Sequence, residues 1–419
     1  MLRNFFKITF RNFRKNKSYV FINLLGLGLS LACCIVGYLN WKYAADYDKN
    51  HANHERIYKV HINKSVQNKD VPYGIAPLPL GDQIKGKIAG VSHYSRYAEN
   101  GLILKKDLKV FNKDISFVED DFFEMFTFPF KYGNKEALLD RSKIILSAYT
   151  SEVYFGEDDP TGELITLIKE DGTQMSMTVG GVLEEIPTNS SIRFSGITHW
   201  DNYVKIRELE KNDWTRFIAA TFVMTDGNGY PQNLLDNINE NYVSIQNEAR
   251  DDFQISSYYL EQLSNLGVNA MEIRSNWLNE PPPTPAVITP LIMAGLMLLI
   301  ACFNFTNTSI AISSKRLKEI GIRKVMGSDR KQLIFQFMGE NLILASGGLI
   351  VAIAISFLLV PAYSAMWDFI NLELDFGANP EIFGFLGALL VLTSVIAGAY
   401  PSLYISSYQP VKILRGNLS

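Results

Sequence analysis

Four apolar stretches, separated by polar segments, constrain this chain more strongly than any other feature of its sequence. They cover residues 19–41, 287–312, 333–360 and 383–403. A helix that crosses the hydrocarbon core of a bilayer needs about 20 mostly apolar residues, and each stretch reaches that length. The average composition, 47% hydrophobic and 20% charged, hides them because a long polar segment separates the first two. We therefore predict a membrane protein with four transmembrane α-helices.

Small residues recur in all four stretches. In lipid, small side chains let two helices approach closely, so we expect the spans to pack on one another. The residues concerned are Gly26, Gly28, Ala294, Gly295, Gly347, Gly348, Gly384 and Gly387.

The charges beside the apolar stretches predict the direction in which the chain crosses the membrane. Six basic residues and no acidic residue precede the first stretch, and Lys and Arg also dominate residues 313–332. Residues 361–382 are the opposite, with four acidic residues and no basic one. Loops rich in Lys and Arg stay in the cytoplasm. We therefore expect both termini and the 313–332 loop to be cytoplasmic and residues 42–286 to lie outside.

These boundaries define the predicted organisation of the chain. In order, it consists of a cytoplasmic basic N-terminal helix (1–18), the first span (19–41), a large α+β extracytoplasmic domain (42–286), the second span (287–312), a cytoplasmic coupling loop (313–332), the third span (333–360), a short outer loop (361–382), the fourth span (383–403) and a cytoplasmic tail (404–419).

A cleaved signal peptide is the alternative explanation of the first stretch. Ser-Leu-Ala-Cys at 30–33 has the outline of a lipoprotein cleavage site. The apolar run continues through Ile35, Val36 and Leu39, however, and Ser30 stands where such a site needs leucine. We therefore interpret the stretch as a retained span. Cleavage would leave the middle segment on the same side.

Residues 42–286 mix the patterns of strands and helices. Alternation of apolar and polar residues predicts strands over 56–62 and 174–180. Apolar residues at helical spacing predict helices over 78–88 and 233–245. We expect an α+β domain made of two subdomains.

The same segment carries no recognisable catalytic or metal-binding motif. It contains no HExxH or GxSxG motif, and the three cysteines of the chain all lie in the apolar stretches. Two acidic clusters, 119–121 and 157–159, lack the ligand spacing of a calcium loop and are interpreted as solvated surface charge. We predict no catalytic residues and no metal site.

The loop between the second and third spans is the most informative segment. An apolar stripe at roughly helical spacing runs along it, with most basic residues on other faces: Leu317, Ile320, Ile322 and Val325. Gly327 offers a helix end, and Ser328 or Asp329 can cap the next helix. Periodicity alone leaves two interpretations open. The helix either lies at the interface with its basic residues on lipid phosphate, or it docks a cytoplasmic partner.

Polar residues inside the predicted spans require hydrogen-bond partners, because hydrocarbon supplies none. Five polar residues in the cytoplasmic half of the second span are expected to bond across helices or to meet the headgroups: Asn304, Thr306, Asn307, Thr308 and Ser309. Glu340 lies in the third span. We interpret it as paired with a basic residue or involved in helix coupling, in preference to a site for a transported ion.

Several motifs resemble one family of permeases. EIGIRKVMG at 319–327 resembles the cytoplasmic loop of the FtsX-like permease family, and 24–60 is similar to the start of its MacB-like members. Residues 145–165 and 179–194 are also similar to MacB-like permeases, and 399–416 fits the close of the permease unit. The resemblance covers nearly the whole chain, and the loop motif is its most specific part.

The resemblance implies an ABC transporter of the mechanotransmission type. In that family the permease dimerises, and an ATPase binds the loop between the second and third spans. Closure of the nucleotide domains is passed through the first two spans to the outer domain. No GxxxxGK[ST] motif occurs in the sequence, so we expect this chain to bind no cofactor and a partner subunit to bind ATP. The ATPase contacts implied by the resemblance are Arg316, Lys318, Glu319, Ile320, Arg323, Lys324 and Met326.

Three functions remain open at this point. The first is a permease subunit of the bacterial inner membrane, which couples ATP hydrolysis by a partner ATPase to conformational work of its periplasmic domain. That work would be export of a periplasmic substrate or lipoprotein extraction. The alternative is a regulatory membrane protein of FtsX type that activates a periplasmic partner such as a cell-wall hydrolase. A scaffold with no ATPase is the third. The large outer domain favours the first.

The resemblance also implies further partners. They are a second permease copy or a homologous half, in a homo- or heterodimer, and a periplasmic adaptor or target protein. Members of this subgroup often carry a second copy of the unit, so the chain is expected to be a half-unit that dimerises or one half of a longer permease. A net charge of −3 argues against nucleic acid as a partner.

Overall fold

The computed structural model divides the chain into two compact units, Met1–Tyr43 with Thr284–Ser419, and Ala44–Pro283. We name them the helical bundle and the sheet domain. The structure describes residues 2–67, 69–227, 229–266, 273–314, 322, 324–326, 329–367, 370–377 and 379–407.

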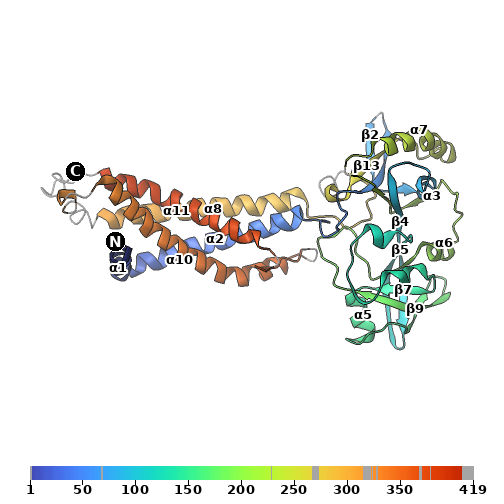
Figure 1. Ribbon diagram of the computed structural model, residues 1–419, viewed down its shortest axis with the longest axis horizontal. Coiled ribbons are helices and arrows are strands. Elements are labelled where there is room, and N and C mark those ends of the chain that lie inside the picture. Colours follow the sequence, from blue (N-terminus) through green and yellow to red (C-terminus); the bar gives the residue numbers. More distant parts are fainter. Residues whose placement is uncertain are drawn as a thin grey trace. The chain divides into compact units, whose positions relative to one another are not determined.

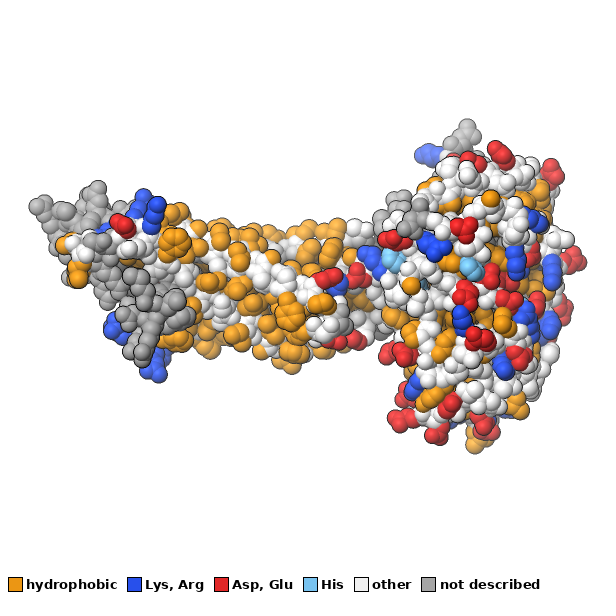
Figure 2. Space-filling model, in the orientation of Figure 1, with side chains coloured by type: hydrophobic (Ala, Val, Ile, Leu, Met, Phe, Trp, Pro, Cys, Tyr) orange, Lys and Arg blue, Asp and Glu red, His pale blue; other side chains and the backbone are white. Residues whose placement is uncertain are grey.

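The helical bundle contains four long apolar helices among its described residues. It begins with α1 (Leu2–Lys15) and continues with α2 (Lys17–Ala45), α8 (Thr284–Ser314), α10 (Arg330–Ser364) and α11 (Glu381–Ser407). All except α1 are long and apolar enough to cross a membrane. They run side by side (Figure 1), and apolar side chains form a band over them (Figure 2). The predicted fold class, four such helices with an α+β domain between the first and second, is confirmed.

Close contacts within the bundle occur at some of the predicted small residues. A Cβ atom on Gly28 of α2 would lie 2.6 Å from Val351 Cγ1 of α10, so only glycine permits this approach. A Cβ on Gly348 of α10 would lie 3.2 Å from Leu27 Cβ. Four other glycines of the predicted set have space around them: a Cβ placed on any of them would have no described atom within 4 Å. They are Gly26, Gly295, Gly384 and Gly387.

Hydrogen bonds tie α2 to α8 along their length. Asn40 Nδ2 donates to the Ala286 carbonyl oxygen at 3.0 Å, and Ser30 Oγ donates to the Met297 carbonyl oxygen at 3.3 Å. Such bonds hold a helix pair in register where no water competes for the donors. The two helices therefore form an antiparallel pair.

The described part of the sheet domain is built on an eleven-stranded sheet. Its order is β13-β1-β12-β4-β5-β10-β7-β9-β6, with β2 paired to β1 and β8 paired to β4 and β9. Most pairs are antiparallel, whereas β10–β5 and β7–β9 are parallel. The strands are β1 (Ile57–Val66), β2 (Lys69–Tyr73), β4 (Val91–Lys106), β5 (Lys109–Val118), β6 (Phe130–Gly133), β7 (Lys143–Leu146), β8 (Leu164–Ile168), β9 (Gln174–Leu183), β10 (Gly196–His199), β12 (Ala220–Thr225) and β13 (Ile255–Gln262). A separate two-stranded sheet pairs β3 (Ala76–Pro77) with β11 (Phe217–Ile218).

One sheet runs through the whole domain, in place of the two subdomains that the sequence led us to expect. The long strand β4 pairs with β12 on one side and with β5 on the other, and it also pairs with β8. It therefore links the end of the sheet that carries β13 with the end that carries β9.

Short helices accompany this sheet. They are α3 (Leu80–Ile84), α4 (Phe122–Met125), α5 (Ala148–Phe155), α6 (Trp200–Arg207) and α7 (Gln232–Ala249), with 3₁₀ turns η1 (Lys135–Leu139) and η2 (Leu263–Asn265). In Figure 1, α7 lies at the end with β13 and β2, and α5 at the end with β7 and β9. The helix predicted over 233–245 is α7. The helix predicted over 78–88 is shortened to α3, because the backbone leaves the helical region at Lys85, with a ψ of 114°, and Gly86 follows with a φ of +65°.

Candidate functional site

The residues predicted to contact an ATPase fall largely outside the described part of the chain. Those that lie outside it are Arg316, Lys318, Glu319, Ile320 and Arg323. Lys324 is described, and its Nζ donates to the backbone oxygen of Ser406 near the C-terminal end of α11, at 2.7 Å. Arg330 Nε lies 3.3 Å from the Ser406 hydroxyl. Ser406 of α11 therefore contacts two residues of this segment, Lys324 and Arg330.

Apolar side chains stand exposed beside Lys324. Met326 is 81% exposed and Val325 is 65% exposed, and Ile322 lies on the same short segment with 52% exposure. Exposed apolar groups beside a basic residue are what a protein docking surface offers, because burial of the apolar area on binding is favourable.

Glu340 lies inside the bundle, where it lines a small polar cavity. The side chain is 7% exposed, and Gln336 Nε2 donates to its Oε1 at 3.2 Å. The cavity of about 30 Å³ is also lined by Asn12, Ser309 and Asn341, so it joins the α1 segment with α8 and α10. A polar space of this size can hold a water molecule. Glu340 is therefore a buried carboxylate at a cavity that residues of α1, α8 and α10 line together.

Asn304 and Asn307 are not brought to Glu340. Both are exposed on α8, on the outside of the bundle, beside Ile300 and Phe303, which are 68% and 64% exposed. The side chain of this helix that bonds across to α11 is Thr306, whose Oγ1 donates to the Ala397 carbonyl oxygen at 3.1 Å. Within the described chain, the predicted cross-helix bond thus belongs to Thr306.

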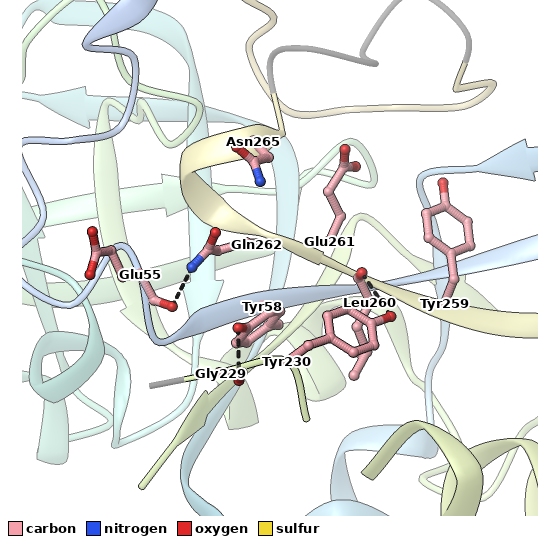
Figure 3. A pocket seen from close by; sticks show the side chains of 9 residues that line it. All are labelled: Glu55, Tyr58, Gly229, Tyr230, Tyr259, Leu260, Glu261, Gln262 and Asn265. Atoms are coloured by element: carbon pink, nitrogen blue, oxygen red, sulfur yellow. Dashed lines mark hydrogen bonds between the residues drawn. The ribbon is translucent and has the colours of Figure 1, made fainter. Parts of the chain in front are cut away.

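An open pocket of about 580 Å³ lies beside the edge strand β13 of the sheet domain (Figure 3). Three tyrosines and two carboxylates share its lining: Tyr58, Tyr230, Tyr259, Glu55 and Glu261. Tyr58 donates its hydroxyl to the Gly229 carbonyl oxygen at 3.0 Å, and Tyr230 donates to that of Leu260 at 3.3 Å. Because backbone oxygens hold these two hydroxyls, the described lining offers aromatic faces and carboxylates for binding without a nucleophile paired to a base.

A second open pocket, of about 590 Å³, has a mixed lining. Glu99, Asp114 and Glu185 contribute carboxylates, and Tyr149 and Trp277 contribute aromatic rings that are 68% and 61% exposed. Both pockets are open surfaces suited to binding a polymer segment or a larger partner more than to enclosing a small reactant.

The interpretation of the first acidic cluster as surface charge is wrong for Glu119, although Asp120 beside it is exposed. Glu119 is 8% exposed and pairs with Arg96 Nη2 at 2.6 Å, beneath the sheet surface. Burial raises the pKa of Glu119, and Arg96 opposes that effect. The cluster at 157–159 is exposed, as expected. Over the described residues, no three His, Cys, Asp or Glu side chains are grouped so that they could hold a metal ion.

Comparison with known proteins assigns both units to one type of permease. Residues 20–241 match the model of the MacB-like periplasmic core domain, and residues 291–410 match that of the FtsX-like permease C-terminal region. The first match alone covers more than half of the chain. The chain belongs to the FtsX-like, MacB-like family of ABC transporter permeases. Membership makes it a membrane subunit with an extracellular domain between its first two spans.

Individual relatives match parts of this permease. The macrolide export ATP-binding/permease protein MacB of Bdellovibrio bacteriovorus is 27% identical over 140 residues, 33% of this chain and 20% of that protein. The uncharacterized ABC transporter permease YknZ of Bacillus subtilis is 28% identical over 186 residues, 41% of this chain and 44% of that protein. The chain thus spans less than half the length of these curated relatives. The solved periplasmic region of MacB from Actinobacillus actinomycetemcomitans aligns with 52% of this chain and 92% of its own length, with a TM-score of 0.37 and 10% identity.

The permease also contains a buried charged cluster that no sequence pattern marks. Lys59 and His61 on β1 are both 0% exposed, and Lys59 lies opposite Glu261 of β13. Lys59 Nζ donates to Asn276 Oδ1 at 2.9 Å. Burial lowers the pKa of Lys59 to about 7, although Glu261 opposes that shift. The alternating pattern predicts that Lys59 lies on a strand. It does not predict that the segment around Asn276 covers the Lys59 side chain, which only the structure shows.

Proposed function

We propose that this chain is the permease subunit of an ABC transporter in which a partner ATPase hydrolyses ATP and the sheet domain performs conformational work outside the membrane. The work is export of a periplasmic substrate or extraction of a lipoprotein. One observation carries the proposal: a single chain joins an FtsX-like permease region to a MacB-like periplasmic core domain. The sequence contains no GxxxxGK[ST] motif, so ATP is assigned to the partner subunit and no cofactor to this chain.

The charge pattern supports an orientation with both termini in the cytoplasm. The exposed basic residues Arg14, Lys15 and Lys17 lie around the start of α2, whereas Glu373 and Asp375 are exposed between α10 and α11. Figure 2 shows Lys and Arg side chains at one end of the bundle and carboxylates at the other. Basic segments are retained in the cytoplasm during insertion. The ATPase would then bind the 313–332 loop on that side.

The exposed face of α8 supports assembly with a second permease copy or a homologous half. Asn304 and Asn307 lie one turn apart on this otherwise apolar face. An amide that faces hydrocarbon loses its hydrogen bonds to water, and a second helix can replace them. We therefore assign this face of α8 to the contact between the two halves.

The proposal is tested by purifying the tagged chain in mild detergent, with and without a non-hydrolysable ATP analogue, and identifying the proteins recovered. We expect an ATPase subunit. Arg323→Glu and Met326→Asp should each lower its recovery at least about tenfold, since Met326 is exposed and the resemblance places Arg323 in the same contact. Lys324→Glu is made separately because Lys324 also bonds to Ser406.

The matched control is Lys15→Glu, which reverses an exposed basic charge near the membrane outside the 313–332 loop. It should leave recovery of the ATPase unchanged. Equal recovery with the loop variants and with the wild-type chain would contradict the assigned docking segment. Recovery of no ATPase in several detergents would contradict the proposed function itself.

A further inference from the structure

The segment that follows α2 is fastened to one loop of the sheet domain. Asp48 N donates to the Asn189 carbonyl oxygen at 3.0 Å, and Asn189 Nδ2 donates to that of Asp46 at 3.3 Å. Tyr47 donates its hydroxyl to the Ser190 carbonyl oxygen at 3.4 Å. Three consecutive residues beyond the end of α2 are therefore held by the same loop.

The centre of this contact is the buried carboxylate of Asp48. Its Oδ1 accepts from Ser191 N at 2.7 Å, and its Oδ2 accepts from the Ser191 hydroxyl. Ser190 Oγ adds a third donor at 3.3 Å. Asp48 is 0% exposed and has a φ of +60°, in the left-handed region that aspartate adopts more readily than most residues with a side chain. Hydrogen bonds to a charged acceptor are stronger than neutral ones, so this contact is a firm one.

The segment that precedes α8 is held by the same residue of the loop. Asn279 N donates to the Ser191 carbonyl oxygen at 3.0 Å. The neighbouring Leu278 is buried in the core of the sheet domain with Phe194, and Lys59 Nζ holds Asn276. Ser191 thus binds both chain segments that connect the sheet domain to membrane helices: Asp48 through its N–H and hydroxyl, and Asn279 through its carbonyl.

We propose that Asp48, Ser190, Ser191 and Asn279 form a clamp that joins the segment after α2 to the segment before α8, so that movement of the α2–α8 pair reaches the sheet domain as one displacement. In this clamp Asp48 is a positioning residue. The inference rests on the proposed function, because it concerns how work at an ATPase is delivered outside. Two sets of hydrogen bonds connect the pair. Asn40 and Ser30 bond α2 to α8, and the clamp connects the segment after α2 to the segment before α8.

The first experiment measures hydrogen exchange of the full chain in lipid nanodiscs and needs no partner. Asp48→Asn keeps the shape of the side chain but replaces one carboxylate oxygen with an amide that cannot accept. We expect exchange to rise at least about tenfold in residues 44–56 and in residues 273–283 together, with β4 and β5 unchanged. Ser191→Ala removes only the hydroxyl bond to Asp48, so it should raise exchange in the same two segments by less. It serves as the test if Asp48→Asn fails to fold.

The matched control is Asp159→Asn. Like Asp48, Asp159 accepts from the N–H and the hydroxyl of a single residue, here Thr161 at 2.9 and 2.6 Å, but both bonds go to Oδ1 and the turn is exposed. This variant should leave both segments at wild-type exchange. If Asp48→Asn raises exchange after α2 but leaves residues 273–283 unchanged, the clamp does not join the two segments and the inference is overturned.

The second experiment uses the complex with the ATPase that co-purifies. With Asp48→Asn we expect ATP hydrolysis to stay within about twofold of wild type, while the change in sheet-domain exchange on adding the ATP analogue falls at least about fivefold. A residue that served stability alone would not separate these two quantities. An unchanged sheet-domain response would overturn the clamp as a transmitting element. If wild-type chain recovers no ATPase, the proposed function fails, while the first experiment still decides whether the clamp joins the segments.

Discussion

Asp48 and Lys59 are both fully buried in the sheet domain, and their pKa values move in opposite directions for the same reason. Burial disfavours the charged form of each group. It raises the pKa of Asp48 to about 6, although hydrogen bonds from Ser191 and Ser190 lower it. It lowers the pKa of Lys59 to about 7, although Glu261 and Glu280 raise it. Each side chain is held in place by neighbours distant in the sequence.

The low pKa of Lys59 predicts how the stability of the sheet domain depends on pH. Between pH 7 and the usual lysine pKa of 10.5, the unfolded chain holds a proton that the folded chain lacks, so stability rises with pH. From pH 7 to pH 9 we expect the free energy of unfolding of the wild-type domain to rise by about 2 kcal/mol from this residue. In the Lys59→Met variant, the free energy of unfolding should not show this increase between pH 7 and pH 9. Pulse proteolysis of the full chain in urea at pH 7, 8 and 9 measures it.

Lys69→Met is the control for this measurement, because Lys69 on β2 is exposed. It should keep the pH dependence of the wild-type chain. A Lys59→Met variant with an undiminished rise between pH 7 and pH 9 would show that Lys59 remains charged when folded.

At the scale of elements, the edge of the sheet is protected by a helix. Tyr258 N donates to Asn239 Oδ1 at 2.7 Å, and Ile255 N donates to Asn247 Oδ1 at 2.8 Å. The amide groups of the same asparagines donate back to the carbonyl oxygens of Tyr258 and Ile255. Two side chains of α7 thus occupy backbone groups of β13 that would otherwise be open to another strand.

The contact between α2 and α10 depends on Gly28. Gly28→Leu should destabilise the bundle by about 2 kcal/mol or more, because even its Cβ would lie 2.6 Å from Val351 Cγ1. Thermal unfolding of the chain in detergent measures the effect. Gly26→Leu is the matched control, because Gly26 lies two residues away on the same helix and no described atom lies within 4 Å of a Cβ placed on it. Leucine has a higher helix propensity than glycine, so propensity alone would stabilise both variants. Equal loss of stability in the two variants would therefore show that the contact with Val351 is not the cause.

At the scale of the whole molecule, the orientation in the membrane is open to direct test. Single cysteines at Tyr149, which is 68% exposed in the sheet domain, and at the exposed Lys17 are treated with a membrane-impermeant maleimide in intact cells. We expect the Tyr149→Cys variant to react and Lys17→Cys to react only after lysis, because basic flanks stay in the cytoplasm. The native cysteines lie in α2 and α8, so they are replaced by serine or alanine in a background that is checked first. The reverse pattern of labelling would overturn the orientation.

Much of the bundle could be predicted from the sequence because its determinants are local. The length of an apolar run decides whether a helix can span hydrocarbon, and it identified α2, α8, α10 and α11 without reference to any partner. Alternation likewise identified β1 and β9, and helical spacing identified α7. The length of the helix around α3 was overestimated, since apolar spacing continues past Lys85, where the backbone leaves the helical conformation.

By itself, the sequence determined the four spans, the order of the units and the family, since these depend on composition along the chain and on contiguous motifs. Only the tertiary structure decided which polar groups are buried and with whom. Glu340 faces a cavity while Asn304 faces outward, and Glu119 pairs with Arg96 beneath the surface. The period of the apolar residues indicates whether a segment is a helix or a strand. Which face of that segment is buried depends on elements that are distant in the sequence. The bond from Ser191 to Asp48 spans 143 residues, and no local pattern carries that information.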